Sequence, residues 1–182
     1  YRVVCDVGDC LFAGQELQLK GASAFLSPAY YLSMGFAVPG AIGAQIAESK
    51  RRPIVLVGDG AFQMTGNEVL TMAKMGLNPI IIVFNNSIYA TLKYCEPPAT
   101  QEKHEIPSVD YSKIAETMGG KGITVNSVGD FKNALSTAKN VNDTFCLLNV
   151  NIDKYDISPA LRTFGEKLGS FVDVSASGGL EK

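Results

Sequence analysis

Short apolar runs alternate with longer amphipathic segments along most of this chain. Residues 54–57 and 80–84 are apolar and rich in β-branched side chains, a pattern typical of strands that are buried on both faces. Between them, residues 62–77 carry apolar side chains at helical spacing, and Gly76 and Pro79 end that segment. We therefore expect a strand, a helix and a second strand, joined by a right-handed crossover that makes the two strands parallel.

The same alternation continues on both sides of this unit and predicts a single α/β domain over residues 1–152. Strands and helices that follow one another in this way form a doubly wound, mostly parallel sheet with helices on both faces. The further elements are expected to be strands at 2–6, 122–125 and 145–150, a loop at 22–31, and helices from Leu11 onward and at 37–49, 110–118 and 130–139.

The two ends of the chain differ from the domain between them. Residues 153–182 are expected to form a C-terminal extension with one short helix at 161–168 and a disordered stretch at 175–179. At the other end, the strand-like residues 2–6 begin almost at once, without a capping loop. We expect from this start a piece of a longer polypeptide, or one subunit of a split enzyme.

Polar residues follow both strands of the central unit. Asp59 lies between Gly58 and Gly60 directly after the first strand, and Asn86 follows the second. Because parallel strands end at the same edge of a sheet, we expect the two side chains to lie close together. Carboxylate and amide oxygens suit Mg²⁺, which keeps positions for phosphates and water, and the helix that starts at this edge favours a phosphate. The residues predict a site for a diphosphate carried on a divalent cation.

Each of these motifs also has a purely structural interpretation. GDG after a strand is common in α/β proteins, and NN is an ordinary turn. Their joint order of strand, GDG, helix, strand and NN is far more restrictive. A dinucleotide fold is disfavoured because Gln63 stands where its third glycine belongs, and no GxxxxGK[ST] sequence occurs. A non-catalytic phosphate-binding scaffold is the remaining alternative.

The combination resembles a known enzyme family. GDG, one βαβ unit and NN, within the stretch SMGFAVPGAIGAQIAESKRRPIVLVGDGAFQMTGNE, are similar to the diphosphate-binding domain of thiamine diphosphate enzymes. The resemblance runs from about residue 3 to residue 150. It points to the group of pyruvate, indolepyruvate and benzoylformate decarboxylases and acetohydroxyacid synthases, and it implies thiamine diphosphate and Mg²⁺ as cofactors. The cofactor-binding residues that it implies are Leu32, Ser33, Met34, Gly58, Asp59, Gly60, Ala61, Phe62, Asn86, Ile88, Tyr89 and Thr91.

The resemblance assigns roles to several of these residues. The side chains of Asp59 and Asn86 and the backbone carbonyl of Ile88 would bind Mg²⁺. Met34 would be the bulky apolar residue that bends the cofactor between its two rings, and the carbonyls of Leu32 and Met34 would bind the aminopyrimidine. By residue type alone, Met34 could equally fill the core, as methionine often does.

Two positions depart from the family's pattern. Pyruvate and indolepyruvate decarboxylases have a catalytic glutamate at the position that aligns with Leu92, and leucine cannot transfer a proton. The text NNSIYATLKY is more similar to benzoylformate decarboxylases. Asp9 stands where relatives carry small hydroxyl residues that contact the diphosphate. We expect Asp9 to cap the helix that starts at Leu11, since a second carboxylate beside a diphosphate is repulsive.

The resemblance implies an activity that needs a second domain. The group decarboxylates 2-oxo acids, and an acetohydroxyacid synthase-like carboligase, a transferase, is the alternative. The glutamate that activates the aminopyrimidine lies in a separate pyrimidine-binding domain, so no catalytic residue is assigned to this chain. We expect that domain in the same polypeptide or in another subunit, a homodimer or tetramer, and a small 2-oxo acid substrate whose identity the sequence leaves open.

Composition narrows the setting of the domain. Hydrophobic residues make up 46% of the 182, charged residues 19%, and the net charge is −2, which gives no general reason to expect nucleic acid or a membrane surface as partner. No apolar run is long enough to span a bilayer. The four cysteines form no CxxC pair and are expected to be free thiols in the cytoplasm. His104 is expected in a solvated loop, and residues 50–52 at a solvated helix end.

Overall fold

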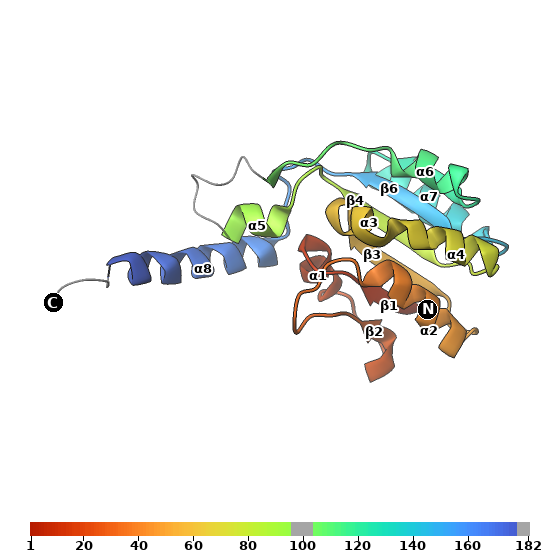
Figure 1. Cartoon of the computed structure of the whole chain (residues 1–182), viewed down its shortest axis with the longest axis horizontal. Coiled ribbons are helices and arrows are strands. Elements are labelled where there is room, and N and C mark those ends of the chain that lie inside the picture. The colour runs from red at the N-terminus through yellow and green to blue at the C-terminus, as the bar shows by residue number, and fades with distance from the viewer. Residues whose placement is uncertain (96–103, 178–182) are drawn as a thin grey trace.

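The computed structural model of the chain describes residues 1–95 and 104–177, with side chains as far as residue 168. Its six strands form one sheet in the order β2-β1-β3-β4-β6-β5, and every strand pair is parallel (Figure 1). The strands are β1 (Arg2–Cys5), β2 (Phe25–Leu26), β3 (Pro53–Gly58), β4 (Ile80–Asn85), β5 (Lys121–Val125) and β6 (Cys146–Asn151). The predicted α/β fold with a parallel sheet is confirmed.

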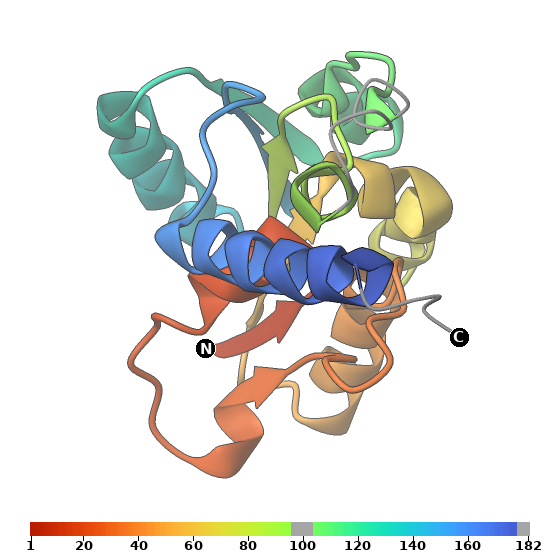
Figure 2. The same ribbon diagram turned by 90° about the vertical axis from the view of Figure 1, so that its left-hand side faces the viewer.

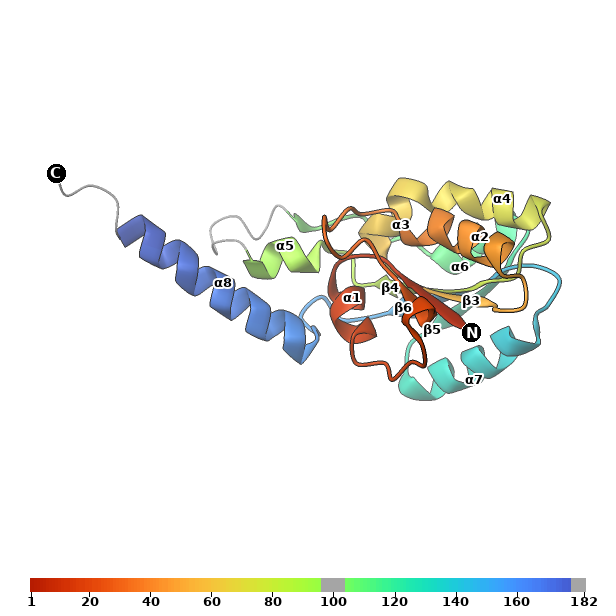
Figure 3. The same ribbon diagram turned by 90° about the horizontal axis from the view of Figure 1, so that it is seen from below.

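Helices cover both faces of the sheet, as Figure 3 shows. One face is covered by α2 (Ala37–Ala47), α3 (Asp59–Thr65), α4 (Val69–Lys74) and α6 (Tyr111–Thr117), and the other by α1 (Asp9–Gly14) and α7 (Val128–Asn140). Successive strand residues point to opposite faces, so Val55 and Val57 pack in the first core and Leu56 in the second. The sheet is therefore buried on both faces, between two hydrophobic cores.

The pattern predicted one helix between β3 and β4, but the structure has an interrupted one. It consists of α3, a 3₁₀ turn at Gly66–Glu68, and α4. Gly66 is tightly packed on Phe62, because a Cβ there would lie 2.5 Å from the Phe62 ring. The glycine accommodates this ring in the core at the point where the helix is interrupted. The interruption therefore begins at a glycine, a residue that disfavours a continuous helix.

The region predicted as a loop at 22–31 contains a 3₁₀ turn (Ala22–Ala24) and strand β2. Two residues carry too short a pattern to predict a strand. Phe25 and Leu26 form one because they pair with Val3 and Val4 of β1. This edge strand therefore depends on its pairing with β1 and not on a pattern of its own.

The C-terminal helix is longer than predicted. Helix α8 (Pro159–Ser177) extends away from the C-terminal edge of the sheet and packs against α5 (Ala90–Cys95) and α1 (Figures 1 and 2). The predicted disorder at 175–177 is wrong, because these residues continue the helix; residues 178 and 179 lie outside the described part of the chain. Of the helices that the structure describes, none is long and apolar enough to cross a membrane.

Residues 50–52 were predicted to be solvated, but one of these basic residues is partly buried. Arg52 is partly buried and donates hydrogen bonds to the carbonyls of Asn78, Ala138 and Lys139. Arg51 donates to Tyr1 O and Ser23 Oγ. These contacts tie together loops at the N-terminal edge of the sheet, opposite to the predicted phosphate site.

Candidate functional site at the C-terminal edge of the sheet

A cavity of about 370 Å³ lies at the C-terminal edge of the sheet. Its walls come from the residues after β1, β3 and β4 and from α1, α5 and α8. The predicted cofactor-binding residues that line it are Leu32, Met34, Gly58, Asp59, Gly60, Ala61, Asn86, Ile88, Tyr89 and Thr91. The structure thus brings together ten of the twelve predicted residues at one cavity.

The other two predicted residues lie apart from the cavity lining. Ser33 is exposed beside it. The Phe62 side chain is 3% exposed and packs edge-to-face on Tyr111, with ring centroids 5.2 Å apart. Only the backbone of Phe62, in the first turn of α3, could therefore take part in the predicted site.

Asp59 joins the ends of β3 and β4. Its carboxylate is 2% exposed and accepts a hydrogen bond of 2.8 Å from the N–H of Gly60 and one of 2.6 Å from the N–H of Ser87. Burial raises the pKa of Asp59 above its ordinary value, and the hydrogen bonds from the backbone oppose that rise. A bound cation would offset the unfavourable burial of this charge.

Asn86 lies next to the residue that Asp59 binds. Its side-chain oxygen accepts a hydrogen bond of 3.2 Å from the N–H of Ile88, and the intervening Ser87 has a positive φ of 57°. Such a conformation is uncommon for a residue with a side chain and marks a tightly constrained turn. The Asp59 carboxylate and the Asn86 side chain therefore bind neighbouring backbone N–H groups of the same turn.

The turn after β4 is braced by a second segment. Tyr89 N–H donates to His104 O at 2.9 Å, and Ile106 N–H donates to Ser87 O at 2.9 Å. This antiparallel contact buries His104, which is 9% exposed. The prediction of a solvated histidine was wrong, because His104 and Ile106 pair with the turn after β4.

Gly58 and Gly60 have different surroundings. A Cβ on Gly58 would meet no atom within 4 Å, so its backbone faces open space at the cavity. A Cβ on Gly60 would lie 2.3 Å from the ring of Tyr89. The close approach that Gly60 permits in this structure is to Tyr89, whereas only Gly58 leaves room for a ligand against the backbone.

Asp9 was predicted to cap helix α1, but it does not. Asp9 is the first residue of that helix, and Gly8, with φ of 97°, occupies the N-cap without a side-chain hydrogen bond. The Asp9 carboxylate instead accepts hydrogen bonds from the N–H of Ser158, at 3.1 Å, and from its hydroxyl. Ser158 Oγ in turn accepts from Leu161 N–H in the first turn of α8. Asp9 therefore anchors α8 beside the cavity.

Thr91 carries a polar atom that lacks a partner. Its Oγ1 is buried and has no hydrogen bond within the described chain, and Thr91 lines the cavity opposite Gly8. A buried hydroxyl without a partner is unfavourable. A polar ligand in the cavity would remove that cost, which fits the predicted binding role of Thr91.

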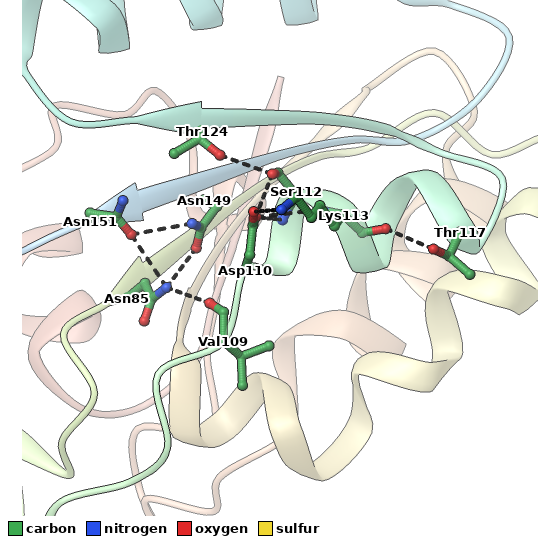
Figure 4. A network of polar contacts seen from close by, with 9 residues as sticks. All are labelled: Asn85, Val109, Asp110, Ser112, Lys113, Thr117, Thr124, Asn149 and Asn151. Carbon is green, nitrogen blue, oxygen red and sulfur yellow. Dashed lines mark hydrogen bonds and ion pairs between the residues drawn. The ribbon is translucent and has the colours of Figure 1, made fainter.

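Two polar features of the site were missed from the sequence. The first is Asp6, directly after β1, which is fully buried and binds backbone N–H groups of residues 35 and 37. The second is a cluster of asparagines at the ends of β4 and β6 (Figure 4). In both cases the signal in the sequence is a polar residue at the end of a buried strand, as for Asp59 and Asn86.

The asparagine cluster fixes the strand end that precedes Asn86. Asn85 Nδ2 donates to Asn149 Oδ1 at 2.8 Å and to Val109 O at 2.8 Å (Figure 4). Asp110, which follows Val109, caps α6 by accepting a hydrogen bond from the N–H of Ser112. It also accepts one from the Ser112 hydroxyl, and this bond lowers the pKa of Asp110. The end of β4 is thus tied to β6 and to the start of α6.

The sequence that forms this cavity matches a known protein family. The model for the C-terminal TPP-binding domain of thiamine pyrophosphate enzymes matches residues 6–150. The chain belongs to this family. The predicted resemblance is therefore confirmed, and thiamine diphosphate is the cofactor of the family.

Individual relatives of this thiamine diphosphate-binding domain are decarboxylases. Indole-3-pyruvate decarboxylase of Azospirillum brasilense is 35% identical over 162 residues, which are 89% of this chain and 29% of that protein. An alpha-keto-acid decarboxylase of Mycobacterium bovis is 28% identical over 171 residues, 92% of this chain and 30% of the relative. The chain therefore spans about three tenths of the length of these relatives.

A solved structure agrees with both relatives. The thiamine diphosphate-dependent 4-hydroxybenzoylformate decarboxylase of Rhodococcus jostii RHA1 superposes with a TM-score of 0.71 at 25% identity. The match covers 84% of this chain and 30% of that structure. The shared fold thus includes most of the domain described here.

Proposed function

We propose that this chain is the diphosphate- and Mg²⁺-binding domain of a thiamine diphosphate-dependent 2-oxo acid decarboxylase, similar to the indolepyruvate and benzoylformate enzymes. The observation that carries the proposal is the buried Asp59 carboxylate, held against the turn of Asn86 at the edge of two parallel strands. The names of the relatives support the reaction class. A carboligase of the acetohydroxyacid synthase type is the alternative activity.

The residues present fit the diphosphate half of the cofactor. Asp59, Asn86 and the carbonyl of Ile88 would bind Mg²⁺, for which oxygen ligands are suited. The first turn of α3 leaves N–H groups without partners inside the helix, and that of Gly60 already binds Asp59. That of Ala61 remains for a phosphate oxygen, beside the open backbone of Gly58, whereas the N–H of Phe62 is the first to bind inside the helix, at Gly58 O.

The ring half of the cofactor would lie over the segment that contains Leu32 and Met34. Met34 lines the cavity and packs on both cores, which gives its side chain a firm support. The unpartnered hydroxyl of Thr91 would bind a polar atom of the cofactor. When bound, thiamine diphosphate supplies the nucleophile and the electron sink for loss of CO₂.

We propose that the group that activates the aminopyrimidine comes from outside this chain. Leu92 lines the cavity but has no group that can exchange a proton. We infer that a pyrimidine-binding domain, in the same polypeptide or in another subunit of a homodimer or tetramer, supplies the activating glutamate. The exposed side chains of Tyr30 and Tyr31, 90% and 82% exposed beside the cavity residue Leu32, support a covering partner.

The free thiols support a reducing setting for the domain. Cys5, Cys10 and Cys146 are buried and Cys95 is partly buried, and none is in a disulfide. Burial raises the pKa of Cys146 to about 11, so this thiol is unreactive at neutral pH. We propose the cytoplasm on this basis.

The experiment that tests the function compares two aspartate variants of the full enzyme. Asp59→Ala should abolish Mg²⁺-dependent binding of thiamine diphosphate and decarboxylation of 2-oxo acids, because it removes the only charged ligand of the proposed site. Asp143→Ala, an exposed residue before β6 at the opposite edge of the sheet, should leave both unchanged. Calorimetric titration of the cofactor measures the difference. Full affinity in Asp59→Ala would refute the metal assignment, and condensation products without free aldehyde would favour the carboligase.

A further inference from the structure

Asp6 is a buried carboxylate that the proposed metal site does not use. It follows β1 and has no exposed surface. Its Oδ1 accepts hydrogen bonds from the N–H groups of Val7, at 3.0 Å, and Gly35, at 3.1 Å. Its Oδ2 accepts one of 2.8 Å from Ala37 N–H. All three donors are backbone N–H groups, so the carboxylate fixes the position of the backbone and not that of another side chain.

The charge is placed where the fold favours it. Ala37 is the first residue of α2, and the N-cap residue Phe36 offers no side-chain hydrogen bond to that helix. The free N–H groups and the positive dipole end of an eleven-residue helix favour a carboxylate. Asp6 thus caps α2 from a position 31 residues earlier in the chain.

The segment from Leu32 to Phe36 depends on this bond for its position. Leu32 and Gly35 have positive φ values of 53° and 87°, so the segment follows an irregular path. Gly35 N–H binds Asp6, while Gly35 O accepts a hydrogen bond of 2.9 Å from Thr65 Oγ1 of α3. Gly35 is therefore held from both sides, by the residue after β1 and by the helix that begins at Asp59. Met34, which lines the cavity, immediately precedes this clamped glycine.

We propose that Asp6 is a positioning residue for the ring half of the cofactor: it fixes the Leu32–Met34 backbone through Gly35 and Ala37, while Asp59 serves the diphosphate half. This inference rests on the proposed function. Asp6 would touch neither the cofactor nor the metal, and it would act only through the segment that it holds. Its loss should therefore affect ligands that have the two rings and spare ligands that consist of the diphosphate alone.

The test compares thiamine diphosphate with inorganic pyrophosphate, each in the presence of Mg²⁺ and with the full enzyme that contains the pyrimidine-binding domain. Asp6→Asn places an amide N–H₂ against one of the backbone donors and weakens at least one charge-assisted bond. We expect thiamine diphosphate to bind about tenfold more weakly or worse, and Mg²⁺-pyrophosphate to bind as in the unmodified enzyme.

A matched control removes a helix cap elsewhere. Ser127 Oγ caps α7 by accepting from Asp130 N–H at 3.1 Å, and Ser127 does not line the cavity. Ser127→Ala should leave the affinities of both ligands unchanged. An equal loss of both ligands in Asp6→Asn, or a loss of neither, would overturn the inference. If the unmodified enzyme bound neither ligand with Mg²⁺, the proposed function itself would fail and the inference with it.

A second variant covers the case in which Asp6→Asn does not fold. Thr65→Val removes the hydrogen bond to Gly35 O from the other side of the clamp and leaves Asp6 intact. We expect a weaker but equally selective loss of thiamine diphosphate affinity. If the affinities of this variant for thiamine diphosphate and for pyrophosphate kept the ratio of the unmodified enzyme, the inference would be overturned. The segment would then keep its position without the hydrogen bond to Gly35 O.

Discussion

Asp59 Oδ2 accepts a hydrogen bond of 2.6 Å from the N–H of Ser87, although 28 residues separate the two. This bond connects the residue after β3 to the turn after β4. It places a buried carboxyl group beside the turn that contains Asn86, at the proposed cation site. The chemistry of the proposed site therefore depends on the protonation state of one carboxyl group.

We predict that Mg²⁺ binding weakens with falling pH earlier than for an ordinary carboxylate. Burial raises the pKa of Asp59, and a metal ligand must be deprotonated. The same shift acts oppositely on the metal-free fold. Because the folded pKa lies above the unfolded one, the contribution of Asp59 to stability is fully present below the unfolded pKa and is lost as pH rises through the folded pKa.

Mg²⁺ titrations at a series of pH values measure the first effect, and denaturant unfolding of the metal-free chain measures the second. Asp59→Asn provides the control, since it cannot titrate and should remove the pH dependence that Asp59 causes. A Mg²⁺ affinity that stayed constant through the range of ordinary carboxyl titration would argue against Asp59 as a ligand.

Alanine substitutions at the two glycines of GDG should have different effects. A Cβ on Gly60 would lie 2.3 Å from the Tyr89 ring, so Gly60→Ala should lower the free energy of unfolding by about 1–3 kcal/mol. Gly58→Ala meets no neighbour within 4 Å, so the stability of the metal-free chain should change little. Urea denaturation of both variants tests this. Equal stabilities would show that Tyr89 moves aside freely.

Gly58→Ala should instead lower cofactor affinity, because the added methyl group occupies space at the cavity. Titration of thiamine diphosphate into the full enzyme with Mg²⁺ measures this effect. Unchanged affinity would mean that the cofactor does not approach the backbone of Gly58.

Asp9→Ala should loosen α8 and leave α1 in place. The variant removes the acceptor of Ser158 N–H and Oγ, and the expected loss is about 1–2 kcal/mol of stability at the start of α8. Amide exchange should become faster at Leu161, whose N–H binds Ser158 Oγ, and stay unchanged at Leu11. Ser158→Ala should give the same pattern, and the double variant should add little. Faster exchange at Leu11 alone would restore the helix-cap interpretation of Asp9.

Thr91→Val should separate binding from stability. The hydroxyl of Thr91 is buried without a partner, so its replacement by a methyl group should leave the stability of the metal-free chain within about 0.5 kcal/mol or raise it. The affinity for thiamine diphosphate should fall several-fold if that hydroxyl binds the cofactor. Thermal unfolding and calorimetric titration test the two parts. A lower melting temperature with unchanged affinity would contradict both.

The sequence by itself determined the central unit of the fold and the edge of the sheet at which Asp59 and Asn86 lie. The apolar runs of β3 and β4 are long and β-branched, and the polar residues that follow them are adjacent in sequence to those strands. Because parallel strands must end at one edge, the meeting of Asp59 with the turn of Asn86 follows from local patterns and chain topology alone. The buried positions Ala134 and Ala138 of α7 follow in the same way from helical spacing.

The tertiary structure alone decided which partners the remaining polar groups bind. Asp6 binds Gly35 and Ala37, which are 29 and 31 residues away in the sequence. Asp9 binds Ser158, which is 149 residues away. His104 is buried because a segment 15 residues away in the chain pairs with it at Tyr89. Hydrophobic periodicity is a property of neighbouring residues and can be read locally. A carboxylate binds whichever N–H groups the completed fold brings within about 3 Å, and that depends on the packing of the whole chain.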